Sequence, residues 1–191
     1  METTGLIDTE KVFADAFDKF QKSAFRLERL QTYDVEEERE LFRKFLKEGA
    51  AKSCPPEFED GCKQIARATA QGRLFQRVRR ISFPLNDYTR FEMLNGYRFC
   101  IEAGERVRIL EGPDAISNLV GTLGEIKDFW LFDDNLCFEL EYDEQGQFVA
   151  VHQVEISKLP FYVTAKSKLW QASVELGKSK AWKLVWTPQT P

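Results

Sequence analysis

The sequence predicts a mixed α/β fold, in which a central mixed sheet of about five strands is flanked by helices and ends in an antiparallel meander. Three apolar segments, residues 129–132, 136–142 and 148–154, are separated by the turn sequences at 133–135 and 143–146. Short segments rich in aromatic and β-branched residues, with Asp, Asn and Gly between them, are typical of a β-meander. Apolar residues at helical spacing elsewhere in the chain predict helices that cover the sheet.

The middle segment of the meander indicates which side of the sheet is buried. Its side chains alternate strictly between apolar and acidic residues: Leu136, Phe138, Leu140 and Tyr142 against Glu139 and Glu141. Successive side chains of a strand point to opposite faces, so this alternation predicts one apolar face and one hydrated face.

Three helices are predicted before the first confident strand. Asp8 is placed to cap the first helix, Asp34 begins a second that ends at Gly49, and Pro56 begins a third that ends near Gly72. Residues 23–33 fit either a strand or a continued helix, and we interpret them as a connector.

Residues 74–83 predict a strand that is unusually rich in arginine. The next helix begins near Asn86 and contains Gly96, where we expect a bend. A short strand at 106–110 and a brief helix at 114–120 then lead into the meander.

After the meander, a long helix is expected from Pro160 to Leu176. The single globular domain is therefore predicted over residues 8–177, followed by a Lys/Trp-rich extension at 178–191. In this extension Trp182, Leu184 and Trp186 alternate with other residues. We interpret it first as a final strand packed on the domain, then as a protein contact, and last as a nucleic acid contact.

Composition places the chain among soluble globular proteins. Its 191 residues include 16 phenylalanines, enough for a large aromatic core. No apolar segment approaches the ~20 residues of a membrane-spanning helix, and the N-terminus lacks the basic and then apolar order of a signal peptide. We therefore expect a cytoplasmic protein that does not associate with membranes, with reduced and mostly buried cysteines.

Charge is distributed unevenly, although the net charge is only −4. Residues 105–157 include 3 basic and 12 acidic residues, whereas residues 158–191 include 6 basic residues and 1 acidic residue. A broad basic surface is missing, so direct nucleic acid binding is not expected.

The arginine-rich region is the first candidate for chemistry. Its members are Arg73, Arg77, Arg79, Arg80, Arg90 and Arg98. Guanidinium groups bind phosphates and carboxylates in a bidentate manner, which would suit an anion site. The other interpretation, which we favour, is that they pair with the acidic residues of the meander in a neighbouring strand.

Two adjacent carboxylates, Asp133 and Asp134, are the second candidate. They could hold a hard cation such as Mg²⁺, but Asp and Asn also form turns through hydrogen bonds to their own backbone. We favour the turn and assign no metal site. The single histidine, His152, has no partner of recognised catalytic spacing, and no phosphate-binding glycine loop is present.

Three sequence blocks, at 25–46, 79–93 and 127–134, resemble an uncharacterised bacterial family. It is common in actinobacteria and often encoded near helix-turn-helix regulators. The DFWLFDD block is the most specific, and the similarity extends over about residues 13–176. The positions that match the family's motifs are Tyr33, Asp34, Arg80, Asp87, Arg90, Phe91, Glu92, Phe129, Trp130, Asp133 and Asp134.

The resemblance implies no agreed activity. The strand–helix plan is loosely similar to a phospholipase-D-like half domain, as found in some bacterial regulators. The His-x-Lys pair of that chemistry is missing, because His152 is followed by Gln153 and Val154. The resemblance also suggests a helix-turn-helix regulator as a partner protein.

We hypothesise a non-enzymatic regulatory module that recognises an anionic small molecule or a partner protein, without a cofactor. The predicted anion site consists of Arg77, Arg79, Arg80, Asp87, Arg90, Trp130, Asp133 and Asp134. Two alternatives stay open. One is a metal-assisted phosphoryl hydrolase that uses Asp87, Arg90 and the two adjacent aspartates. The other is an accessory protein of a DNA-binding regulator.

Overall fold

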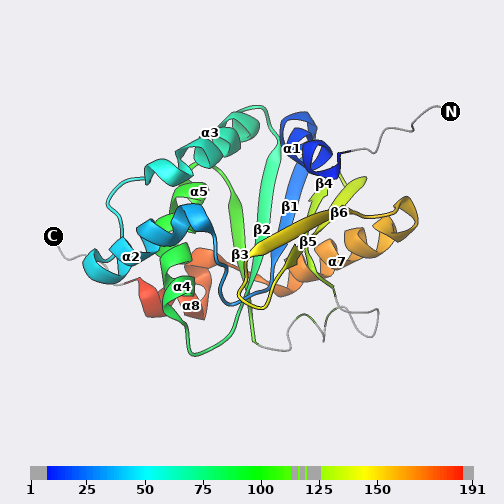
Figure 1. The fold of residues 1–191 in the computed structure, drawn as a ribbon. Helices are drawn as coiled ribbons and strands as arrows, with labels where there is room; N and C mark the ends of the chain where they lie inside the picture. The colour runs from blue at the N-terminus through cyan, green and yellow to red at the C-terminus, as the bar shows by residue number, and fades with distance from the viewer. Residues whose placement is uncertain (1–7, 113–115, 117–118, 120–125, 187–191) are drawn as a thin grey trace.

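Seven strands form one sheet in the computed structural model, which describes residues 8–112, 116, 119 and 126–186 (Figure 1). The strands are β1 (Ser23–Glu28), β2 (Leu74–Ile81), β3 (Arg106–Glu111), β4 (Asp128–Phe132), β5 (Leu136–Tyr142), β6 (Phe148–Gln153) and β7 (Val174–Glu175). Their order is β6-β5-β4-β1-β2-β3-β7. β1, β2 and β3 are parallel, and the other pairings are antiparallel, so the predicted mixed sheet is confirmed.

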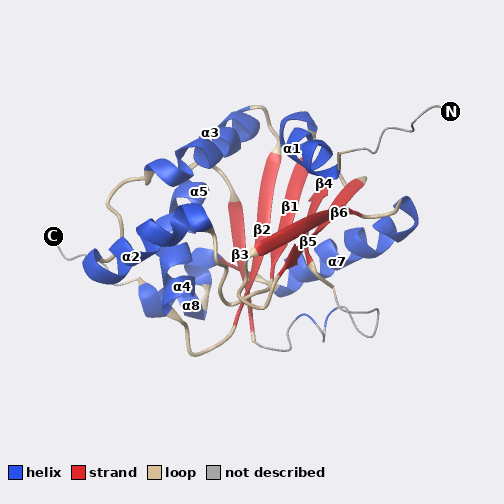
Figure 2. Cartoon of the chain, in the orientation of Figure 1, coloured by secondary structure: helices blue, strands red, loops and turns tan. Residues whose placement is uncertain are grey.

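Helices lie on both sides of this sheet (Figure 2). They are α1 (Thr9–Lys19), α2 (Arg39–Glu48), α3 (Pro56–Ala70), α4 (Asp87–Phe91), α5 (Arg98–Glu102), α7 (Leu159–Ala172) and α8 (Lys180–Val185). Local sequence explains their starts. The side chains of Asp8, Asn86 and Ser179 accept hydrogen bonds from the first turns of α1, α4 and α8. Gly49, at a φ of 82°, ends α2 as expected.

The two faces of the sheet carry separate cores. On the face covered by α7, called here the α7 face, Phe25 and Leu27 of β1 pack with Phe129 of β4 and Leu169 of the helix. On the opposite face, called the α3 face, α1 and α3 cover an aromatic cluster that includes Trp130. Further along the α3 face, α8 and the segment Glu92–Tyr97, which lies between α4 and α5, cover β2 and β3. In Figure 1 α7 lies on one side of the sheet and α2 to α5 lie on the other.

Strand β1 corrects the interpretation of residues 23–33 as a connector. It is a central strand, paired with β2 in parallel and with β4 in antiparallel orientation. Phe25 and Leu27 point to the α7 face, whereas Arg26 and Glu28 point to the α3 face. Because both sets are buried or half-buried, the usual contrast between an apolar and a hydrated side is lost.

The C-terminal elements also differ from the prediction. The helix from Pro160 ends at Ala172, and the short strand β7 follows, so the sheet has seven strands instead of about five. The alternating tryptophans belong to a helix, α8, and not to a final strand. Ala181 of α8 is fully buried, and Trp182 packs against the same cluster as Ile109 of β3.

Gly96 falls where the backbone leaves regular α-helical geometry. Residues Glu92–Tyr97 form a π-helical segment between α4 and α5. A π-segment accommodates one extra residue per turn, and such segments are frequent at functional sites. The predicted brief helix at 114–120 lies mostly outside the described residues.

Candidate functional site

Charged side chains occupy the interior of the α3 face at the centre of the sheet. Arg26 and Glu28 of β1 lie in register beside Arg77 and Arg79 of β2. Leu27 and Val78, between them in sequence, are fully buried on the opposite face. Two central strands therefore present a row of four charged side chains beneath α3 and the π-helical segment.

Glu28 is the shared acceptor of this row. Its Oε1 accepts a hydrogen bond from Nη1 of Arg77 at 2.7 Å, and its Oε2 accepts one from the Tyr97 hydroxyl at 2.7 Å. Arg26 Nε lies 3.0 Å from the same Oε1 but does not have the geometry of a hydrogen bond. Burial opposes ionisation, but the guanidinium groups of Arg26, Arg77 and Arg79 lower the pKa of Glu28 to about 2.

A second carboxylate, Glu92 of the π-helical segment, lies on the other side of Tyr97. The Tyr97 hydroxyl is 3.0 Å from Oε1 of Glu92, and Nη2 of Arg79 is 2.5 Å from its Oε2. Burial raises the pKa of Glu92 to about 7, against the opposing effect of Arg79. Glu92 is therefore partly protonated near neutral pH, whereas Glu28 is ionised.

Arg77 connects this cluster to β3. Its Nε donates to Oε1 of Glu105 at 2.9 Å, and the side chain of Glu105 is fully buried. Oε2 of Glu105 is buried without a hydrogen bond. Arg79 is itself fully buried, and its guanidinium lies 4.9 Å above the ring of Tyr33.

A cavity of about 340 Å³ opens over this charged row. The sheet contributes Arg26, Glu28 and Arg77 to its lining. Aromatic residues from several elements form part of the walls: Tyr33, Phe58, Tyr88, Tyr97 and Tyr142. Three further glutamates, Glu38, Glu57 and Glu92, also line it. Its volume and its combination of apolar walls with a few convergent polar groups are those of small-molecule sites.

Two further acid–phenol pairs border the cavity. Tyr88 donates to Oε2 of Glu38 at 3.0 Å, and Tyr33 donates to Oδ2 of Asp128. Burial raises the pKa of both carboxyl groups, while the hydrogen bond from each tyrosine opposes the change. Several acids with perturbed pKa values around one cavity are typical of a functional site.

The residues of the predicted anion site lie in separate parts of the structure. Arg77 and Arg79 belong to the charged row, and Arg80 Nε donates to the carbonyl of Arg29 at 2.9 Å. Asp87 and Arg90 are exposed on α4. Trp130 is buried in the aromatic core and contacts the row through Arg26, whose guanidinium lies 5.4 Å from its ring centroid.

Asp133 and Asp134 lie at the opposite edge of the sheet. Asp133 accepts backbone hydrogen bonds from Gln21, Lys22 and Ser23, at the start of β1. Asp87 follows the end of β2, which is parallel to β1. Eight extended residues span roughly 25 Å, so these two aspartates do not share one ion.

The prediction that the arginines pair with acidic side chains is confirmed for Arg77 and Arg79, but the predicted acidic partners were wrong. Arg77 and Arg79 pair with Glu28, Glu92 and Glu105, which come from β1, the π-helical segment and the start of β3. The meander acids have other partners. Glu139 accepts from Tyr162, and Glu141 lies 2.8 Å from His152. β4 separates β5 from β1, so these acids are not neighbours of β2.

Sequence reasoning missed most of the residues that surround the cavity. Arg26 and Glu28 were missed because residues 23–33 were interpreted as a connector. Glu92 and Tyr97 were missed because only the apolar residues of their helix were expected to be buried. The one available signal was the alternation of Phe25 and Leu27 with charged residues, which fits a strand buried on both faces only if the charges are paired.

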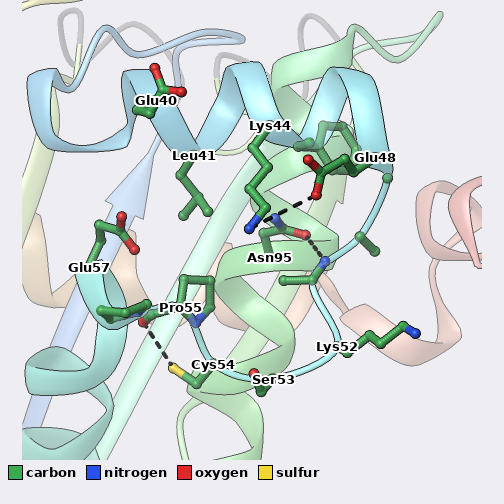
Figure 3. A pocket seen from close by; sticks show the side chains of 15 residues that line it. Glu40, Leu41, Lys44, Glu48, Lys52, Ser53, Cys54, Pro55, Glu57 and Asn95 are labelled. Atoms are coloured by element: carbon green, nitrogen blue, oxygen red, sulfur yellow. Dashed lines mark hydrogen bonds and ion pairs between the residues drawn. The ribbon is translucent and has the colours of Figure 1, made fainter.

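A second cavity, of about 410 Å³, lies between α2 and the loop that precedes α3 (Figure 3). Asn95 fixes this loop, because its Oδ1 accepts a hydrogen bond from the backbone of Ala51 at 3.1 Å. Lys44 points into the cavity, but its ammonium is 4.0 Å from Glu48. The cavity has fewer buried charged groups than the one over the sheet, and we call it the loop cavity.

Within the part of the chain that the structure describes, no group of three or more His, Cys, Asp or Glu side chains is arranged to hold a metal ion. In the same residues, no helix is both long enough and apolar enough to cross a membrane.

Comparisons with known proteins identify the family but no activity. A family model described as a domain of unknown function, DUF6879, matches residues 11–179. Among solved structures, NucT from Helicobacter pylori is similar over 88% of this chain and 91% of its own, with 11% identity and a TM-score of 0.47. A comparison with curated proteins found no match.

Proposed function

We propose a function from the premise that this chain belongs to the DUF6879 family, whose domain has no known function. The protein is a small-molecule-binding module, and its ligand occupies the cavity over β1 and β2. The ligand carries an acidic group, a carboxylate or a phosphate, that pairs with Arg26. A planar portion of the ligand packs against the tyrosines of the wall.

The observation that supports this proposal most directly is that neighbouring carboxylates neutralise the charge of Arg26 only in part. Its nearest carboxylate, Glu28, also accepts hydrogen bonds from Arg77 and Tyr97, whereas Arg26 pairs with Glu28 without a hydrogen bond. Arg77 has Glu105 as a second acid, and Arg79 has Glu92. The side chain of Arg26 remains 22% exposed, against 13% for Arg77 and 0% for Arg79.

This arrangement suits a charged group that arrives with the ligand. A guanidinium that lines a cavity, as Arg26 does here, can bind carboxylates and phosphates with two parallel hydrogen bonds. The lining also includes Glu28, Glu38 and Glu57. Burial raises the pKa of Glu38 and of Glu92, so these two carboxyl groups carry less negative charge near neutral pH than ordinary glutamates do. The surrounding rings supply apolar contact area and can stack on a planar group.

A binding role is favoured over the hydrolase alternative by the positions of the acids. Asp133 already accepts three backbone hydrogen bonds, and Asp134 pairs with Lys166 at 2.8 Å. Both are remote from Asp87 and Arg90. A regulatory partner, including the helix-turn-helix protein that the family resemblance suggests, stays part of the proposal as the recipient of the ligand signal.

The test is thermal unfolding of the full chain with a panel of aromatic carboxylates and aromatic phosphate monoesters. Each acid is compared with its neutral amide or its dephosphorylated form. At a ligand concentration 100 times Kd, linkage gives about 3 kcal/mol of stabilisation, or a Tm increase of roughly 5–10 °C for a chain of this size. At least one acid is expected to give this shift, and its neutral counterpart is not.

Arg26→Gln is expected to abolish the shift. Arg43→Gln is the matched control, because Arg43 is an exposed arginine of α2 that pairs only with Glu40 on its own helix. If no acid in the panel raises Tm, or if Arg26→Gln retains the full shift, the proposed ligand site is wrong.

A further inference from the structure

Three cysteines from three different elements meet at the edge of the cavity over the sheet. Cys54 belongs to the loop before α3, Cys62 to α3 and Cys100 to α5. The Sγ atoms of Cys54 and Cys62 are 3.7 Å apart, and the thiol of Cys100 also donates to Cys62. None of the three is fully buried, unlike Cys137. The expectation of mostly buried cysteines therefore holds fully for Cys137 and only in part for this cluster.

The thiol cluster lies between the two cavities. Cys62 and Cys100 line the cavity over the sheet, and Cys54 lines the loop cavity. Figure 3 shows the side chain of Cys54 at the edge of the loop cavity, next to Pro55. Small polar reagents can thus reach the cluster from the solvent side of the loop.

Cys62 has the environment of a reactive thiol. Hydrogen bonds from Cys100 and then Cys54 lower the pKa of Cys62 to about 6, although burial opposes this. The thiolate is the nucleophilic form of cysteine, and reactive cysteines are typically half-exposed and close to a second, resolving thiol.

We propose that Cys62 and Cys54 form a peroxide-reactive thiol pair, in which Cys62 is oxidised first and Cys54 closes a disulfide with it. This inference does not depend on the proposed ligand. It assigns a modification site whose substrate class is hydrogen peroxide or a small organic hydroperoxide.

The reaction is balanced by the two thiols and one peroxide. The Cys62 sulfur attacks a peroxide oxygen, the O–O bond breaks, and hydroxide leaves and takes up the proton that Cys62 released. A sulfenic acid remains on Cys62. The Cys54 sulfur then attacks the Cys62 sulfur, the S–O bond breaks, and the hydroxyl leaves as water with the Cys54 proton. Two thiols lose two electrons, and hydrogen peroxide is reduced to two waters.

Cys54 is a better second thiol than Cys100 because of its place in the fold. It belongs to a loop, whereas Cys100 is held in α5, directly after the π-helical segment. Burial and the hydrogen bond to Cys62 raise the pKa of the Cys54 thiol to about 11, so at pH 7 Cys54 enters the second step as a thiol, and its proton leaves with the hydroxyl group. Closing 3.7 Å to the ~2 Å of a disulfide requires a small movement of the loop.

Tryptic peptide mapping of the peroxide-treated full chain tests the pairing. Cleavage after Lys52 and Lys63 leaves Cys54 and Cys62 in one peptide, residues 53–63, and Cys100 falls in the separate peptide 99–106. After one equivalent of hydrogen peroxide at pH 7 and alkylation, we expect peptide 53–63 to lack both alkyl groups and two hydrogens. A cross-link between peptides 53–63 and 99–106 instead would overturn the choice of Cys54.

Alkylation kinetics on the unmodified protein test the nucleophile without any substitution. At pH 7 Cys62 should react with iodoacetamide at least about tenfold faster than Cys54, since most of Cys62 is thiolate and almost none of Cys54 is. Cys54→Ser should trap a dimedone-reactive sulfenic acid on Cys62, whereas Cys62→Ser should leave Cys54 unoxidised. Cys137→Ser is the matched control and should leave the disulfide unchanged. Equal alkylation rates, or full alkylation of peptide 53–63 after peroxide, would refute the proposal.

Discussion

Tyr97 has a single phenolic proton and two carboxylates to receive it. Its hydroxyl is 2.7 Å from Glu28 and 3.0 Å from Glu92, and both acids lie near Arg79. If both were ionised, the single phenolic proton could serve only one of them. The arrangement is satisfied when Glu92 is protonated and donates to Tyr97, which in turn donates to Glu28.

This protonation makes stability depend on pH through Glu92. The pKa of Glu92 is about 7 in the folded protein, against 4.5 for an ordinary glutamate of an unfolded chain, so the folded form binds the proton more tightly. The contribution is fully present below pH 4.5 and is lost as pH rises through 7, at a cost of about 3 kcal/mol. Glu92→Gln should remove this decline from urea unfolding curves recorded between pH 5 and 8.

The informative quantity is the slope with pH, because Glu92→Gln also alters the hydrogen bonds to Arg79 and Tyr97 and should lower stability at every pH. Glu40→Gln, at an exposed position of α2, should keep the decline of the unmodified protein. An identical pH slope in the Glu92→Gln variant would contradict the assignment of the proton to Glu92.

The turn between β4 and β5 illustrates how one element is fixed by a distant one. Asp133 and Asp134 both have left-handed backbone conformations, with φ values of 51° and 60°, which Asp tolerates better than most residues. The Asp133 carboxylate accepts from three successive backbone N–H groups at the start of β1. These hydrogen bonds are its structural role, and they tie the meander to the N-terminal half of the chain.

Asp133→Ala should therefore destabilise the protein by about 2–3 kcal/mol, since it leaves three backbone donors without their acceptor. The neighbouring Asp134→Ala also places Ala in a left-handed backbone conformation, but it removes only a partly exposed pair with Lys166, so it should cost about 1 kcal/mol. Chemical denaturation at pH 7 measures both. Comparable losses in the two variants would show that the backbone hydrogen bonds of Asp133 are not what stabilises the turn.

At the level of elements, the sequence was informative wherever one face of an element is apolar and the other is hydrated. The meander and helices α1, α2 and α3 satisfy this condition and were predicted. β1 does not, because Arg26 and Glu28 replace its hydrated face with buried ion pairs. α8 was read as a strand because Trp182, Leu184 and Trp186 alternate, although only Trp182 among them packs on the core of the domain.

For the molecule as a whole, the charged row forms the polar centre of the α3 face, under α3 and the π-helical segment. The aromatic cluster under α1 and α3 lies beside this row. The sequence could indicate that the arginines are paired, since buried charges require partners. It could not indicate which acids pair with them. Glu28, Glu92 and Glu105 lie on segments far apart along the chain, and only the sheet order and the path of the helices bring them together.

The central claim is that the cavity over β1 and β2 binds an acidic small molecule through Arg26. A crystal structure of the protein with the most stabilising acid of the panel tests it most directly. The account predicts the acidic group about 3 Å from the Arg26 guanidinium, with the planar portion between the tyrosines of the wall. A ligand bound at exposed Arg90, or in the loop cavity with the cavity over the sheet empty, would contradict it.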